Sequence, residues 1–338
     1  MARRRAQAEV FAARGEWGAV AETLAPVAQK LDADGALLLA GAHAQTGQAA
    51  DAATTIQHAL ERFHTHAGLW LAWIDAALRE KQWTAALQRI QTAAGAVGDS
   101  AELHWRAAQA YFHLGAALGK VETRSVPEGR AGQFAEGWLL LEPRGPDRFL
   151  CCPPASALNQ LRRALDAGLD LPAAHALHAR IWQAAGQPKT GLDVLKTREA
   201  AWLEHGDAVV LETLTALALE AGALDDYLRY ARRAAARTPG RRDEILGEAY
   251  RSAARSCAER GEWKLCRGFC YRALALRPHD VELMCQVADL EWAAGRLGEA
   301  GAWYRRVLER QPGHPRRMQI LERLAAQPAE SRATPPPD

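Results

Sequence analysis

Four cysteines in the last third of the chain have a spacing that could support metal or thiol chemistry. Cys266 and Cys270 lie at i and i+4, which would place both on one face of a helix, and Cys257 and Cys285 lie on the flanking segments. A structural zinc ion would need four sulfurs at ~2.3 Å from one metal, which side chains on separate rigid helices rarely allow. Free cysteine also packs as a small buried hydrophobe. We therefore predict that these four residues belong to the core and bind no metal.

Two further pairs have suggestive spacing. Cys151 and Cys152 are adjacent, which leaves a redox or metal role open, although no basic side chain is placed to lower the pKa of either thiol. His175 and His178 lie at i and i+3 and could face one metal ion, but they fall on the apolar stripe of a predicted helix, where a packed or hydrogen-bonded histidine is the simpler interpretation.

Familiar catalytic motifs are absent from the sequence. It contains no glycine loop that would hold phosphate, no His-Glu-x-x-His zinc motif and no Cys-x-x-Cys pair. We therefore predict a protein that is not an enzyme, with no catalytic residue, no metal and no cofactor.

The elements that carry these residues repeat along the chain. Ala52, Ile56 and Ala59 occupy one helix face, and the same pattern recurs further along as Ala86, Ile90 and Ala93. Small residues at such positions let two helices approach to ~8–10 Å. Four other positions recur with the same step: Gly261 as Gly295, Cys266 as Ala300, Ala273 as Val307 and Pro278 as Pro312. A period of about 34 residues is typical of stacked helix-turn-helix hairpins and resembles the tetratricopeptide repeat (TPR) family.

The resemblance implies an all-α fold, a right-handed α-solenoid of about eight helix-turn-helix repeats. In repeat one we predict helices over 3–13 and 17–31, and in repeat five a second helix over 188–204. Residues 238–243 are expected to form a hinge or a wider loop, because the step from Gly222 to Gly261 is longer than the step from Gly261 to Gly295. The predicted divisions are repeats one to three with the first helix of repeat four (1–119), an insertion (120–153), the rest of repeat four with repeats five to eight (154–312), a capping helix (313–327) and a disordered tail (328–338).

Tryptophans mark several of these helices. Trp70 lies where the TPR pattern has a large aromatic residue in the first helix, and Trp17, Trp83 and Trp263 open second helices. Aromatic side chains bury the largest area per residue in protein cores. We therefore predict that the tryptophans fill the space between stacked hairpins.

The insertion at 120–153 interrupts the fourth repeat. It is rich in Gly and Pro, and two short apolar runs, 134–142 and 148–152, flank a turn. This pattern predicts a small β-hairpin, with a third strand over 121–126. An isolated hairpin is only marginally stable in water, so we expect it to pack on the helices or on a partner. Its candidate contact residues are Phe134, Trp138, Leu140 and Phe149.

Resemblance to the TPR family also implies a concave groove, lined by the first helices, that receives an extended or helical segment of another protein. The repeat register predicts twelve groove residues: Asp75, Arg79, Trp105, Arg106, Gln109, His113, Arg180, Gln183, Arg251, Arg255, Asp289 and Trp292.

Arginines stand out among these groove residues. Arg106, Arg180, Arg251 and Arg255 together would favour an acidic or C-terminal carboxylate-bearing segment, because a guanidinium binds a carboxylate in a bidentate manner. They could equally be solvated positions balanced by nearby acids. The Lys/Asn carboxylate clamp of the co-chaperone TPR proteins is not found at these positions.

Composition narrows the choice of partner. The 338 residues include 42 Lys and Arg and 40 Asp and Glu, a formal net charge of +2, with both signs mixed along the chain. A nucleic-acid or membrane-surface binder usually has a concentrated basic field. No apolar run reaches the ~18 residues of a membrane span, and no secretory signal is evident. We therefore expect a cytoplasmic location; the sequence leaves the oligomeric state open.

Together these patterns predict a non-enzymatic interaction scaffold or adaptor. It would bind a partner segment in the groove, with the insertion determining specificity. An accessory subunit that positions a substrate for an associated enzyme is the alternative.

Overall fold

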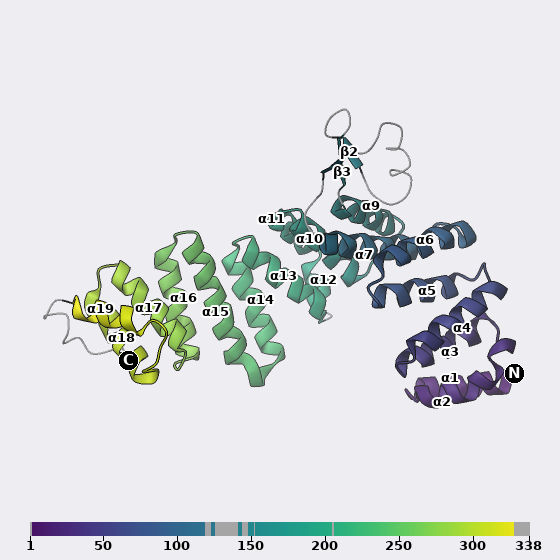
Figure 1. Ribbon diagram of the computed structural model, residues 1–338, viewed down its shortest axis with the longest axis horizontal. Helices are drawn as coiled ribbons and strands as arrows, with labels where there is room; N and C mark the ends of the chain where they lie inside the picture. The colour runs from purple at the N-terminus through teal and green to yellow at the C-terminus, as the bar shows by residue number, and fades with distance from the viewer. Residues whose placement is uncertain are drawn as a thin grey trace. The chain divides into compact units, whose positions relative to one another are not determined.

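The computed structural model describes residues 2–118, 123–125, 141–143, 148–151, 153–204 and 206–327, with their side chains over 3–114, 157–204 and 206–327. These residues form helical hairpins that follow one another along the chain (Figure 1). The chain divides into two compact units, Met1–Ala185 (unit 1) and Gly186–Asp338 (unit 2). The boundary falls inside the predicted fifth repeat.

In unit 1 the helices pair as hairpins, α1 with α2, α3 with α4, α5 with α6 and α7 with α9, and the first helices α1, α3, α5, α7 and α10 contact one another in that order. This is the packing that the repeat period predicts. The elements are α1 (Ala2–Ala13), α2 (Trp17–Leu24), the 3-10 helix η1 (Ala25–Lys30), α3 (Ala33–Gln45), α4 (Ala49–Arg62), α5 (Ala67–Arg79), α6 (Trp83–Val97), α7 (Ala101–Leu118), α9 (Pro153–Asp166) and α10 (Pro172–Ala184).

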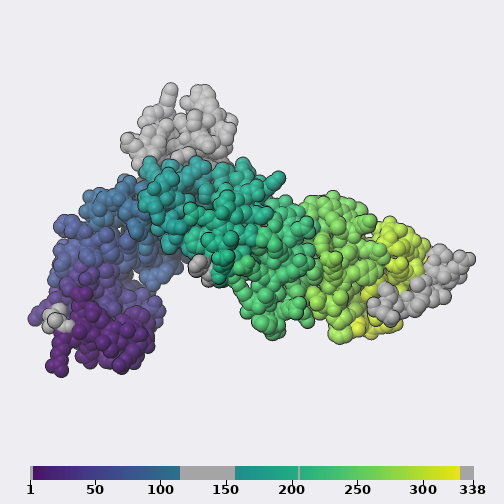
Figure 2. All heavy atoms as spheres, turned by 180° about the vertical axis from the view of Figure 1, so that it is seen from behind, coloured from purple at the N-terminus to yellow at the C-terminus, as the bar shows by residue number. Residues whose placement is uncertain are grey.

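Unit 2 repeats this arrangement, with hairpins of α13 with α14, α15 with α16 and α17 with α18. With all atoms drawn, its neighbouring hairpins touch along their length (Figure 2). The elements are α11 (Pro188–Lys196), α12 (Glu199–Glu204), α13 (Ala208–Glu220), α14 (Leu224–Arg237), the 3-10 turn η2 (Pro239–Arg241), α15 (Arg242–Glu259), α16 (Trp263–Leu276), α17 (Val281–Ala293), α18 (Leu297–Arg310) and α19 (Arg317–Ala325).

Three short strands fall within the predicted insertion: β1 (Thr123–Ser125), β2 (Leu141–Pro143) and β3 (Arg148–Cys151). They pair antiparallel in the order β1-β3-β2, with Arg124 opposite Phe149 and Glu142 opposite Leu150. Most of the insertion lies outside the described residues, as does the predicted tail at 328–338. The fold of the insertion as a complete unit, and any role for it, therefore stay predictions.

Several predicted helix boundaries are wrong. The second helix of repeat one ends at Leu24 and continues as η1, because Pro26 has no N–H for a helical hydrogen bond. The second helix of repeat five is interrupted between Lys196 and Glu199. Residues 238–243 are not a wide loop: after the single turn η2, α15 runs for 18 residues, whereas α13 has 13, so a longer helix absorbs the stretched spacing.

Alanines form much of the contact between helices. In the described residues, alanines at equivalent positions of successive hairpins expose at most 4% of their surface: Ala8, Ala40, Ala52, Ala86, Ala108, Ala254, Ala288 and Ala300. Because alanine is small, helices that cross at these positions can approach closely; other hairpins bury a larger residue at the equivalent place, such as Ile74 in α5 and Cys266 in α16.

The prediction of burial is confirmed for the four cysteines but not for every tryptophan. Cys257, Cys266, Cys270 and Cys285 are buried free thiols, as predicted. Trp70 is buried, but Trp263 exposes 59% of its surface, so the prediction that the tryptophans fill interior space is wrong there. Over the part of the chain that is described, no helix combines the length and apolar character needed to cross a membrane.

Several hairpin turns contain a residue in the left-handed backbone region. Gly15, Gly47, Gly222 and Gly295 have φ between 71° and 80°. In repeat three, Lys81 takes the position that Gly47 has in repeat two, with φ of 59°. In this region a Cβ lies too close to a backbone carbonyl oxygen, which destabilises any residue except glycine.

The last repeat contains a fully buried carboxylate. Glu291 on α17 accepts hydrogen bonds from Arg267, Arg296 and the hydroxyl of Tyr271, the last at 3.0 Å. Burial alone would raise the pKa of Glu291, but the hydrogen bonds from the two arginines and Tyr271 outweigh burial and lower it. Glu291 therefore ties α16, α17 and the turn before α18 together.

Lys81→Gly should raise the free energy of unfolding by up to about 1 kcal/mol in urea denaturation. The left-handed penalty of ~1–2 kcal/mol disappears, and the greater freedom of glycine in the unfolded chain offsets part of the gain. As a control, Gly47→Ala should lower the free energy of unfolding by about 1–2 kcal/mol. The added Cβ would meet no neighbouring atom, but alanine would have to adopt the unfavourable left-handed φ of this position. A Lys81→Gly variant less stable than the parent would contradict this account.

Glu291→Gln should lower the free energy of unfolding by about 3 kcal/mol at pH 7, since two arginines lose a buried partner. Glu299→Gln is the matched control: Glu299 contacts the same Arg267 at 3.2 Å, but 39% of its side chain is exposed, so the loss of free energy should be below about 1 kcal/mol.

Acid should erase the difference between the parent and Glu291→Gln. The folded pKa of Glu291 lies below its unfolded value of 4.5, so its contribution is complete above that value and is lost as pH falls through the folded pKa. An unchanged difference under acid conditions would contradict this assignment.

Candidate functional site

Unit 1 contains a surface hollow of about 560 Å³ between α5 and α7, here called the α5–α7 hollow. Asp75 and Arg79 line it from α5, and Gln109 and His113 line it from α7. The four side chains come together because the first helices of successive hairpins pack side by side, which brings residues about one repeat apart into contact. These are four of the predicted groove residues.

Aromatic rings shape one end of this hollow. The ring of His113 stacks on Trp83, with centroids 4.7 Å apart and planes 18° apart. The pKa of His113 is lowered, first by burial and then by the positive charges of Arg180 and Lys81. The guanidinium of Arg180 is exposed and lies 5.3 Å from the ring centre of Phe112.

Arg106 is occupied within the chain. Its Nε and Nη2 donate to the two carboxylate oxygens of Asp75, at 2.7 and 2.8 Å. This bidentate pair joins α5 to α7 and neutralises both charges. Two further predicted groove residues, Trp105 on α7 and Gln183 on α10, are partly buried.

Unit 2 places its predicted groove residues around a smaller cavity of about 230 Å³. Arg251 and Arg255 from α15 line it together with Asp289, and Cys266 and Cys270 from α16 also line it. The Nη1 of Arg251 lies 3.5 Å from a carboxylate oxygen of Asp280. Arg255 is exposed, without an ion pair among the described residues.

Asp289 and Trp292 hold the terminal helix. Asp289 accepts two hydrogen bonds from Arg316, at 2.8 and 3.1 Å, and further ones from Arg323 and Tyr304. Burial would raise the pKa of Asp289, but these partners lower it. Arg323 also lies 5.7 Å from the ring centre of Trp292. The engaged charges leave little of this part of the predicted groove for a ligand.

The four arginines predicted to act together do not form one set. Arg106 and Arg251 are engaged by carboxylates one repeat away, and Arg180 and Arg255 belong to different compact units. The physical reason is that facing first helices carry complementary charges, which neutralise each other before a ligand arrives.

The remaining candidates from the sequence are the histidine pair, the possible metal ligands and the residues of the insertion. Nε2 of His175 lies 2.9 Å from Asp170, and burial is the main cause of the lowered pKa of His178. In the described part of the chain no cluster of metal-ligating side chains occurs. Phe134, Trp138, Leu140 and Cys152 lie outside the described residues, and only the backbone is described for Phe149 and Cys151.

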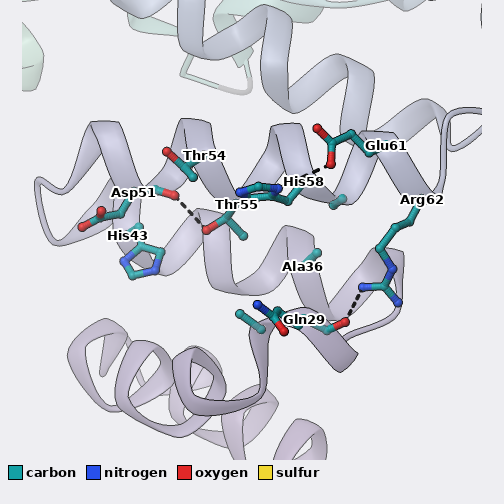
Figure 3. Close-up of a pocket in the computed structure, with 11 residues that line it drawn as sticks. Gln29, Ala36, His43, Asp51, Thr54, Thr55, His58, Glu61 and Arg62 are labelled. Carbon is teal, nitrogen blue, oxygen red and sulfur yellow. Dashed lines mark hydrogen bonds and ion pairs between the residues drawn. The ribbon is translucent and has the colours of Figure 1, made fainter.

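A second hollow of about 560 Å³, here called the η1–α4 pocket, was not predicted from the sequence. Its walls come from η1, α3 and α4 and include Gln29, Ala36, His43, His58 and Arg62 (Figure 3). A signal was available: Ala36 lies one repeat before the buried Trp70, so a small residue stands where the next repeat has a large one.

Comparison with known proteins identifies the fold. No protein-family model and no curated protein sequence matches the chain. Among solved structures, the C-terminal part of a TPR repeat-containing protein from Cytophaga hutchinsonii matches with a TM-score of 0.55 and 11% identity, over 83% of this chain and 98% of that one.

Two further structures are similar at lower scores. A tetratricopeptide repeat protein from Parabacteroides merdae gives a TM-score of 0.45 and 11% identity, covering 87% of this chain and 98% of that one. YrrB, described as a TPR protein with an unusual peptide-binding site, gives 0.44 and 16%, covering 68% and 96%. At 11% identity the likeness to the Cytophaga hutchinsonii structure concerns the fold alone, and it agrees with the hairpin order and the repeat period. The chain is therefore a helical repeat protein with the tetratricopeptide-repeat fold.

Proposed function

We propose that this protein is an interaction scaffold that binds an acidic segment of another protein in the α5–α7 hollow. The observation that carries the proposal is the charge around His113. Two cations, Arg180 and Lys81, lie close enough to lower its pKa, and Arg79 lines the same hollow. An uncompensated positive field beside an open cavity favours a negatively charged ligand.

The nearby acids do not cancel this field. Asp75 is neutralised by its bidentate pair with Arg106. Glu80, at the end of α5, interacts with the partly buried guanidinium of Arg89. Arg79, Lys81 and Arg180 therefore remain to attract an acidic ligand.

The size of the hollow suits part of a peptide. Ligand pockets commonly enclose ~300–1,000 Å³, and 560 Å³ accommodates a few side chains. The stacked rings of Trp83 and His113 supply a flat apolar surface beside the cations. We infer that carboxylates of the partner pair with the arginines while its backbone lies along the rings.

A fluorescent peptide rich in Asp and Glu provides a direct test by anisotropy titration. Arg79→Glu combined with Arg180→Glu should weaken binding by about tenfold or more at low salt, since attraction becomes repulsion. Arg317→Glu, an exposed site in unit 2, is the control for general surface charge. Equal weakening by Arg317→Glu, or none by the double variant, would overturn the proposal.

Binding of the acidic peptide should also change the pKa of the His113 imidazole. A bound carboxylate stabilises the protonated ring, so the pKa of His113 should rise on binding, and affinity should increase as pH falls through the raised value. NMR titration of the ring with and without peptide measures the shift. A pKa that does not change, or falls, would place the peptide elsewhere.

We also propose that the insertion at 120–153 controls specificity, either by docking on the partner or by covering the hollow. Its Gly and Pro content and its apolar runs have no role in stacking hairpins. The buried free cysteines of unit 2 support a reducing, cytoplasmic compartment for such an adaptor.

Replacing residues 121–152 by a short Gly-Ser linker should preserve the helical circular dichroism and change peptide affinity. A docking insertion gives weaker binding when removed, and a covering one gives tighter binding. Removal of the terminal residues 328–338 is the control. If the insertion deletion binds as the parent does, the insertion has no part in recognition.

A further inference from the structure

The η1–α4 pocket arises from one repeat position. The fourth residues of three successive first helices are Ala36 in α3, Trp70 in α5 and His104 in α7, each one repeat after the last. The residues before these helices, Asp32, His66 and Ser100, keep the same spacing. The three side chains therefore occupy equivalent places in three consecutive hairpins.

The cavity beside this position is larger where the side chain is smaller. Trp70 is buried, and its Nε1 donates to the carbonyl of His64 at 2.7 Å. His104 is held by Gln160 at 2.7 Å and lines a cavity of about 230 Å³. Ala36 offers only a methyl group, and the cavity beside it is about 560 Å³. One repeat after Ala36, the indole of Trp70 therefore fills the equivalent position.

The pocket is held open by its own walls. Arg62 on α4 donates to the carbonyl of Gln29 in η1 at 2.7 Å, which ties the two sides together across the pocket (Figure 3). Only Leu31 and Asp32 separate η1 from α3, whereas the connection between α4 and α5 is longer. The short connection between η1 and α3 limits how far η1 can move toward the pocket.

The lining suits an aromatic group. The hydroxyls of Thr54 and Thr55 donate to backbone carbonyls of their own helix, so a ligand does not have to accept hydrogen bonds from them. His43 and His58 contribute imidazole rings to the lining, and Nδ1 of His58 lies 3.5 Å from the carboxylate of Glu61 (Figure 3). A flat ring with one donor group could pack on the imidazoles and donate to the carboxylate of Asp51.

We propose that the η1–α4 pocket binds an indole-sized aromatic side chain of a partner protein, which takes the place that Trp70 fills in the next repeat. The site lies on η1, α3 and α4 and does not depend on the α5–α7 hollow or on the acidic ligand proposed for it. A partner that uses both sites would contact unit 1 at two places.

N-acetyl-L-tryptophanamide is a suitable probe, with binding measured by saturation-transfer NMR and calorimetry. Ala36→Trp should fill the pocket and weaken probe binding by about tenfold or more. Thr92→Trp is the control, because it adds an indole at an exposed site of α6. Retained binding by Ala36→Trp, or equal loss in Thr92→Trp, would overturn the proposal.

Two further measurements complete the test. If circular dichroism shows that Ala36→Trp does not fold, Ala36→Leu should weaken binding by about threefold through partial filling, and no weakening would contradict the assignment. A Trp-containing peptide should bind at least as well as the amide and lose binding when that Trp is replaced by Ala. Binding of the amide with rejection of the peptide would overturn the assignment to a protein partner.

The two proposed sites of unit 1 can be separated. Arg79→Glu with Arg180→Glu should leave binding of N-acetyl-L-tryptophanamide unchanged. A loss in that variant would show that the probe occupies the α5–α7 hollow and would overturn the assignment to the η1–α4 pocket.

Discussion

The close approach of helices at alanine positions is the constraint on which this structure depends. Several crossings hold only a methyl group, as the buried Ala52, Ala86 and Ala300 show. Because each hairpin buries its apolar side on its neighbours, a loss of contact at one crossing affects the next hairpin directly. The α5–α7 hollow lies between two such hairpins, and the η1–α4 pocket lies beside one of them.

Much of the fold could be predicted from the sequence because the repeat is local. The recurrence of Ala52, Ile56 and Ala59 as Ala86, Ile90 and Ala93 indicated helices, their pairing and their inward faces. Helix ends were harder to predict. Pro26 lies where the α-helix gives way to a 3-10 helix, and an α-helix is interrupted after Lys196, but neither change alters the apolar pattern. The exposed Trp263 shows that residue type alone does not determine burial.

The candidate sites were less predictable, because charges pair between repeats. Arg106 with Asp75, Arg229 with Glu199 and Arg277 with Glu248 are separated by 31, 30 and 29 residues, close to one period. A search for opposite charges at that separation would have shown that Arg106 is engaged. The η1–α4 pocket required a comparison of side-chain size at one position across repeats, which periodicity of apolar character does not reveal.

The length of α15 has a consequence for how such a chain tolerates extra residues. The residues that it has beyond the length of α13 continue the same helix, so their backbone groups bond within the helix at ~1.5 Å of rise per residue. Extra residues at this helix start therefore need no new loop, and α15 still pairs with α16 as α13 pairs with α14. Extra residues that do not continue a helix must find other partners for their backbone groups.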